Sequence, residues 1–174
     1  MAPDWRGLAT RQTDLVASLT LVNPTAIDPN ALSPLASRLV VFTGDQGPPA
    51  ERLRQSLAGL HDATVITLRD YLGVTWADVI ADRTQEIGAA MLDFLQRVDQ
   101  RHRSEALVLP EGEGEVAGIS YRIRGAGPPL VLLPLALAPS QWEPLLPTLS
   151  ANYCTITLGG AALGMVALLE ARGR

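Results

Sequence analysis

Apolar residues along the chain fall into short runs, separated by segments rich in proline and glycine. The run at 130–133, Leu-Val-Leu-Leu, is continuous, which is typical of a strand buried on both faces of a parallel sheet. A second apolar run, at 153–158, is rich in threonine and isoleucine. Between the two runs, Ser140 and Glu143 have the spacing of a capping box, which begins a helix. The chain from 127 to 160 is therefore predicted to form a strand, a helix and a second strand parallel to the first.

The same periodicities predict further strands and helices in alternation. Strands are expected at 18–22, 39–43, 64–68 and 119–124, and helices at 8–15, from Pro48 onward, at 76–98 and at 161–172. Residues 119–124 alternate apolar with polar positions, as an antiparallel or edge strand does. Thr75 and Asp78 have the spacing of another capping box at the start of the longest predicted helix. The fold class that follows is α/β, a mostly parallel sheet with helices on both faces.

The composition fits one folded domain of 174 residues, of which 47% are hydrophobic and 18% are charged. Residues 99–118 are charged and rich in glycine, so we expect them to link a segment at 1–98 to a segment at 119–174 within that domain. The net charge of -4 gives no electrostatic footprint for nucleic acid. The single cysteine, Cys154, lies in a predicted strand, where a small buried side chain is the ordinary case.

The sequence also bears on compartment and cofactors. No signal-peptide pattern is present and no apolar run reaches the ~18 residues of a membrane span, so a cytoplasmic protein outside the membrane is expected. No set of histidine, cysteine and carboxylate residues has metal-ligand spacing. We therefore expect neither a metal nor a cofactor.

Two stretches of the chain resemble the α/β-hydrolase superfamily, in the reverse of the family's order. Residues 119–160 resemble the family's beginning: a paired edge strand, a Gly-Pro-Pro turn, an apolar strand, a helix opened by tryptophan and another strand. Residues 1–98 resemble its end, where RQTDLVASLTLVNP is similar to the helix and strand after the nucleophile, and LVVFTGDQGPPAERLRQSLAGLHDATVITL to the last two strands. The reversed order indicates either a circularly permuted domain with 99–118 as its joint, or a junction between two modules.

The resemblance implies two kinds of partner. The family's central strand has no counterpart in this chain, so a homodimer is expected, formed through unpaired strand edges or by an exchange of halves. Residues 118–174 separately resemble a region that precedes the catalytic domain of some S-adenosylmethionine-dependent methyltransferases. That second resemblance implies a fused or associated methyltransferase domain, which would follow Arg174.

Hydrolases of this family place a nucleophile on a sharp turn, an acid after a later strand and a histidine after the last strand. At the place of the nucleophile turn, Asp4 and Trp5 resemble the Asp-Trp pair of haloalkane dehalogenases and epoxide hydrolases. The resemblance implies that Asp4 attacks carbon and that Trp5 lines the pocket. Arg6 stands where the turn usually has glycine, and the alternative is that Asp4 caps a helix.

Two further aspartates are candidates for the same site. Asp45 and Asp70 each follow a predicted strand, at the edge of the sheet where ligands bind in open α/β folds. Asp45 is the candidate acid, and Asp70 is a candidate ligand-binding residue. The alternative for both is turn chemistry, since aspartate after a strand commonly bonds nearby backbone groups.

The remaining catalytic elements of the family have no counterpart in the sequence. His61 precedes its strand and His102 follows the longest predicted helix, so both are expected at the amino edge of the sheet. Pro134, which has no N–H to donate, stands where the family's oxyanion loop begins. The first hypothesis is a non-catalytic, hydrolase-like scaffold or interaction domain. The alternative is a hydrolase of esters, epoxides or haloalkanes, with Asp4 as nucleophile.

Two other patterns in the sequence could bind an anion. The glycine-rich stretch 159–164 follows a strand and loosely imitates a phosphate loop, with close helix packing as the alternative. Arg122 and Arg124 are candidates for binding an anion, with a solvated charged face as the alternative.

Overall fold

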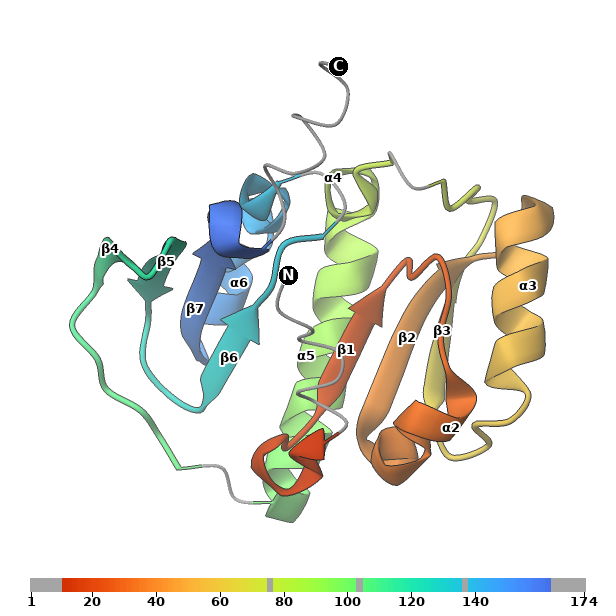
Figure 1. The fold of residues 1–174 in the computed structure, drawn as a ribbon, viewed down its shortest axis with the longest axis horizontal. Helices are drawn as coiled ribbons and strands as arrows, with labels where there is room; N and C mark the ends of the chain where they lie inside the picture. The colour runs from red at the N-terminus through yellow and green to blue at the C-terminus, as the bar shows by residue number, and fades with distance from the viewer. Residues whose placement is uncertain (1–10, 75–76, 103–104, 136–137, 164–174) are drawn as a thin grey trace. The chain divides into compact units, whose positions relative to one another are not determined.

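The computed structural model describes residues 11–74, 77–102, 105–135 and 138–163. These residues divide into two compact units, each of which has its own sheet. The parallel-sheet unit comprises the described residues of 5–79 and 85–103. The mixed-sheet unit comprises the described residues of 80–84 and 104–174. Figure 1 labels the strands and helices of both.

The parallel-sheet unit contains three parallel strands in the order β1-β2-β3. Their bounds are Leu19–Val22 for β1, Leu39–Gly44 for β2 and Thr64–Leu68 for β3, which confirms the three strands predicted in this part of the chain. All six residues of β2 are buried, as the unbroken apolar run of a central parallel strand requires. In Figure 1, β2 lies between β1 and β3.

η1 (Thr13–Leu15) precedes these strands. The short helices that connect them are α2 (Pro29–Leu32), η2 (Ser33–Arg38) and α3 (Gly47–Leu57). The side chain of Asp28 caps α2 by accepting a hydrogen bond from the backbone N–H of Asn30 at 3.0 Å. One hydrophobic cluster joins these helices to the sheet, and it consists of Leu32, Ala36, Leu39, Val41, Leu53, Leu57 and Leu60.

The predicted helix at 76–98 is two helices, α4 (Val79–Asp82) and α5 (Thr84–His102). The hydroxyl of Thr84 donates to the carbonyl of Ile80 at 2.7 Å and lies 3.3 Å from that of Ala81, so it satisfies backbone groups where α4 ends. The long helix has a buried apolar face, formed by Ile87, Met91, Phe94, Leu95 and Val98. Thr75, of the predicted capping box, lies outside the described residues.

The mixed-sheet unit contains four strands in the order β4-β5-β7-β6. The strands are β4 (Gly112–Val116), β5 (Ile119–Arg124), β6 (Pro129–Leu132) and β7 (Cys154–Gly159). β6 and β7 are parallel and are joined by η3 (Pro139–Trp142) and α6 (Leu146–Ser150), so the predicted strand, helix and parallel strand are confirmed. β5 is antiparallel to both β4 and β7, which confirms an antiparallel strand at 119–124.

The predicted fold class needs one correction. The α/β class is confirmed, but the single, mostly parallel sheet is wrong, because the described residues form a parallel sheet of three strands and a mixed sheet of four. The stretch 99–118 contains the end of α5 and the whole of β4. β4 turns into β5 at Ala117 and Gly118, whose φ angles of 52° and 76° are those of a tight two-residue hairpin turn. Of the predicted helix at 161–172, the described part is η4 (Ala161–Leu163).

The prediction that 130–133 is buried on both faces is also wrong. β6 is an edge strand, and the side chain of Val131 is 52% exposed while that of Leu132 is buried. The capping box at Ser140 does not form either, because Ser140 lies within η3. Pro144 and Pro147 follow closely and keep this connection in short helical turns. None of the described helices is long and apolar enough to cross a membrane.

Candidate functional site

The carboxyl edge of the parallel sheet holds the predicted acid, Asp45. This residue follows β2 directly and its side chain is half-buried. Its Oδ1 atom accepts a hydrogen bond from the backbone N–H of Tyr71 at 3.2 Å. The next residue, Gln46, donates its backbone N–H to the carbonyl of Tyr71 at 3.2 Å. Asp45 therefore holds the turn that follows β3, which is the turn chemistry considered as its alternative role.

Close backbone contacts explain the sequence around this turn. A Cβ atom on Gly44 would lie 2.1 Å from the carbonyl oxygen of Tyr71, and one on Gly73 would lie 2.1 Å from the side-chain oxygen of Asn23. The amide of Asn23 also donates to the carbonyl of Val74 at 3.4 Å. The ends of all three parallel strands are thus joined by direct contacts, which leave the polar groups of Asn23 and Asp45 engaged by backbone.

The other predicted site residues stand in different positions. Asp70 immediately precedes Tyr71, its side chain is exposed, and its backbone has a left-handed φ of 52°, which aspartate tolerates in turns. Asp4 and Trp5 lie outside the described residues. Within the described part of the chain, Asp45 and Asp70 thus follow neighbouring strands, and Asp45 bonds to the backbone of Tyr71, the residue after Asp70.

The histidines bear on whether this edge can act as a hydrolase site. His61 is exposed and precedes β3, so the whole of that strand separates it from Asp70. Five strand residues span about 17 Å, far beyond the reach of a hydrogen bond. His102 is the last residue of α5. The prediction that His61 lies at the amino end of its strand is confirmed.

The loop after β6 is the place of the implied oxyanion loop. Pro134 lies there, and it has no N–H to direct at a substrate oxygen. The carbonyl just before it, on Leu133, accepts the indole N–H of Trp142 at 2.8 Å. Trp142 is 4% exposed, so this bond fixes the loop to the connection between β6 and β7.

An open groove of about 490 Å³ lies in the mixed-sheet unit, between β4, β5 and η3. Three glutamates, two serines and one arginine are among the residues that line it: Glu113, Gly114, Glu115, Ser120, Tyr121, Arg122, Pro139, Ser140, Glu143, Thr157, Leu158 and Gly159. The register places Glu113 opposite Arg122, and Arg122 opposite Thr157, so the three side chains share one face of the sheet.

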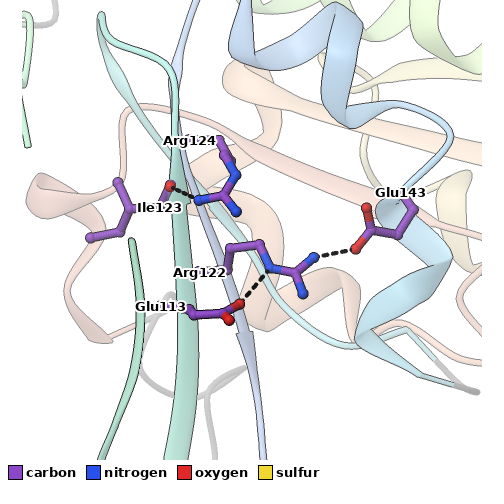
Figure 2. Close-up of polar contacts among 5 residues, drawn as sticks. All are labelled: Glu113, Arg122, Ile123, Arg124 and Glu143. Atoms are coloured by element: carbon purple, nitrogen blue, oxygen red, sulfur yellow. Dashed lines mark hydrogen bonds and ion pairs between the residues drawn. The ribbon is translucent and has the colours of Figure 1, made fainter. Parts of the chain in front are cut away.

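Arg122 joins the two walls of this groove. Its Nε donates to the carboxylate of Glu113 on β4 at 3.3 Å, and its Nη1 donates to the carboxylate of Glu143, which follows η3 (Figure 2). The pKa of Arg122 is raised above its ordinary value. The hydrogen bond to Glu113 is the largest cause, and the hydrogen bond to Glu143 is the second. Both carboxylates compete with any anion for this guanidinium. Sequence reasoning missed this network, because it assigned Glu143 to the capping box.

Arg124, the other candidate for anion binding, donates its Nη1 to the carbonyl of Ile123 at 2.9 Å (Figure 2). Arg122 and Arg124 therefore both have internal partners, in agreement with a solvated charged face.

The first turn of η3 is held by a different residue from the predicted one, since the backbone N–H of Ala138 donates to the side chain of Gln141 at 3.3 Å.

The glycine-rich stretch after β7 serves close packing. A Cβ atom on Gly159 would lie 2.6 Å from the Cγ of Pro139, and one on Gly160 would lie 2.5 Å from the carbonyl of Gly118. The backbone N–H of Ala162 already donates to that carbonyl at 3.2 Å. This geometry matches the alternative to a phosphate loop. Among the described residues, no group of three or more histidines, cysteines or carboxylates is placed to hold a metal ion.

A comparison with protein-family models found none that matches this chain, and a comparison with curated proteins found no match either.

Proposed function

We propose that this chain is a non-catalytic, α/β-hydrolase-like domain that acts as a scaffold or interaction module. The observation that carries the proposal is the engagement of Asp45 by the backbone N–H of Tyr71. An acid of a hydrolase site must orient a histidine, and this carboxylate orients a turn of the backbone instead. The distance along β3 between His61 and the turn supports the same conclusion.

The hydrolase relationship itself rests on the resemblance of the sequence, and the succession of elements supports it. A hairpin, an apolar strand, a connection that includes Trp142 and a parallel strand follow one another in the mixed-sheet unit. Two parallel strands and a long helix follow one another in the other unit. In each unit, the order of the elements is the one that the resemblance implies for the matching half of the family's fold.

The proposal includes two partners. We infer a homo-oligomer, because each sheet of the described chain ends in edge strands, and unpaired strand edges invite pairing. We also infer an association with an S-adenosylmethionine-dependent methyltransferase domain, which rests on the resemblance of 118–174 alone.

The test is hydrolysis of short-chain aryl esters, epoxides and haloalkanes by the purified chain and by its Asp4→Asn and Asp45→Asn variants. We expect no turnover above the background of either variant. Activity that Asp4→Asn abolishes would establish the alternative, a hydrolase with an aspartate nucleophile, and would refute the scaffold. Activity that both variants retain would indicate a contaminating enzyme, which a second purification would remove.

A further inference from the structure

The described chain has four edge strands, β1, β3, β4 and β6, and they differ in how far they resist pairing. Natural proteins blunt sheet edges with charge or with proline. In β4, Glu113 and Glu115 alternate with glycine. β6 begins at Pro129, which has no N–H, and the carbonyl of Leu133 beyond its end is occupied by Trp142. Both edges of the mixed sheet therefore carry protection.

The edge strands of the parallel sheet contain neither a charged residue nor a proline. β1 is uncharged, but all four of its side chains are half-buried, and Leu19 and Leu21 pack against the hydrophobic cluster. β3 reads Thr-Val-Ile-Thr-Leu, without charge or proline, and Val65 is 42% exposed. Among the described residues, the strand paired with β3 is β2. In the part of the chain that the structure describes, β3 is thus the edge strand that is exposed and carries neither charge nor proline.

The backbone of β3 directs alternate residues outward. The N–H of Asn23 donates to the carbonyl of Phe42 at 2.9 Å. This bond shows which residues of β2 direct their backbone groups toward β1, and the residues between them direct theirs toward β3. Following the registers of β1 with β2 and of β2 with β3, the even-numbered residues of β3 bond to β2. Val65 and Thr67 therefore direct their N–H and C=O groups away from the sheet.

A small hollow of about 130 Å³ lies beside this edge. Val65 and Thr67 form one side of it, and Ala50, Arg54 and Leu57 of α3 form another. An edge strand with free backbone groups and an adjoining hollow for a side chain is the arrangement that accepts an added strand.

We propose that β3 pairs with β3 of a second copy of this chain, antiparallel and around a two-fold axis at Ile66. The inference rests on the interaction role proposed above and supplies the partner and the surface for it. Such a two-fold axis keeps each side chain on its own face, so Val65 lies opposite Thr67 of the second copy and Ile66 lies opposite its own counterpart. The outward groups of Val65 and Thr67 then bond reciprocally and join the two sheets into one of six strands.

Neighbouring registers fit less well. Centring the axis on Thr67 would put the charged Arg69 opposite Val65. Centring it on Val65 would put Ala63 opposite Thr67, and the N–H of Ala63 already donates to the carbonyl of Leu60 at 3.0 Å. The register at Ile66 is the one that uses both outward residues of β3 and no charged one.

A second copy also suits the surroundings of β3. The symmetric pairing places the hollow of one copy beside the hollow of the other, since Val65 and Thr67 line both. Arg54 at the rim is ion-paired with Glu51 of the same helix, so the two rims approach without net like charge. An isologous contact requires self-complementarity of this kind.

Light scattering after size-exclusion chromatography tests the proposal. At micromolar concentration the wild-type chain should have twice its 18.6 kDa mass, and Val65→Lys should raise the dimer dissociation constant at least about tenfold. Val116→Lys is the matched control, because Val116 is an exposed valine (65%) in an edge strand of the other sheet. A monomeric wild type, a dimer that survives Val65→Lys, or equal losses in both variants would each overturn the proposal.

Crosslinking tests the register independently of stability. In an antiparallel pair without mutual hydrogen bonds the Cα atoms are about 4.5 Å apart, within disulfide range. Ile66→Cys should therefore give a disulfide-linked dimer on a non-reducing gel, and Thr64→Cys, which lies opposite Leu68, should give none. The wild type should stay uncrosslinked, because Cys154 is buried. Crosslinking of Thr64→Cys in place of Ile66→Cys would overturn the register.

The two proposals fail separately. A monomer that does not hydrolyse substrates would refute this interface and leave the scaffold standing. A dimer of the expected register with Asp4-dependent hydrolysis would refute the scaffold and leave this interface standing.

Discussion

The carboxylate of Asp45 accepts the backbone N–H of Tyr71 at 3.2 Å, and this bond ties the end of β2 to the turn after β3. We predict that Asp45→Ala lowers the free energy of unfolding by about 1 kcal/mol, because the amide of a part-buried turn loses its acceptor. Asp45→Asn keeps an acceptor oxygen at the same place, so its loss should be smaller. Urea denaturation followed by circular dichroism measures both.

Asp62→Ala is the control for that prediction. Asp62 is an exposed aspartate of the same unit, and its removal should change the unfolding free energy by no more than about 0.5 kcal/mol. If Asp45→Ala proved as mild as Asp62→Ala, the bond to Tyr71 would have no structural weight, and the argument that this turn occupies Asp45 would fail.

Gly44 should tolerate no side chain. A Cβ atom there would lie 2.1 Å from the carbonyl oxygen of Tyr71, which is backbone and cannot rotate away. We predict that Gly44→Ala lowers the unfolding free energy by at least about 2 kcal/mol, through displacement of the turn after β3. Gly112→Ala is the matched control, since a Cβ on Gly112 meets nothing within 4 Å. Similar melting temperatures for the two variants would contradict the prediction.

The strands of the parallel sheet could be predicted because burial leaves a direct mark on sequence. β2 is buried throughout, and its run from Leu39 to Phe42 is continuously apolar, as expected of a strand covered on both faces. The same rule failed for β6, whose equally continuous apolar run belongs to an edge strand with Val131 exposed. A short apolar run shows that a strand exists, but its place in the sheet depends on partners elsewhere in the chain.

The candidate site shows a similar limit. Asp45 and Asp70 were placed at one edge of the sheet from strand order alone, and they lie there. The partner of Glu143 could not be found in this way, because local spacing suggested a capping box while the carboxylate binds Arg122, 21 residues away. Competition between a local and a distant hydrogen bond is decided by the fold, which the spacing of residues does not encode.

Trp142 anchors the loop after β6 through its indole N–H, which donates to the carbonyl of Leu133 at 2.8 Å. Trp142→Phe keeps an aromatic ring but leaves that part-buried carbonyl without its donor. We predict a loss of about 1–3 kcal/mol in the free energy of unfolding. Denaturation monitored by circular dichroism measures it, since the substitution itself changes the tryptophan fluorescence. A loss below about 0.5 kcal/mol would show that water replaces the indole donor.

Arg122 should contribute little to stability, although it bonds two glutamates. Its side chain is 40% exposed, and solvent screening holds such ion pairs to about 1 kcal/mol or less. We predict that Arg122→Gln lowers the unfolding free energy by less than that amount, and that about 1 M salt removes most of the difference.

The pH dependence of this network follows from the raised pKa of Arg122, whose first cause is the hydrogen bond to Glu113. A raised pKa means that the folded chain holds the proton more tightly, so the stabilisation is fully present below the ordinary pKa of an arginine. It is lost only as the pH rises through the still higher value of the folded chain. The difference in stability between wild type and Arg122→Gln should therefore stay constant from neutral to moderately alkaline pH. Urea denaturation across that range tests this, and a difference that shrinks with rising pH would show that another group, rather than Arg122, titrates in the network.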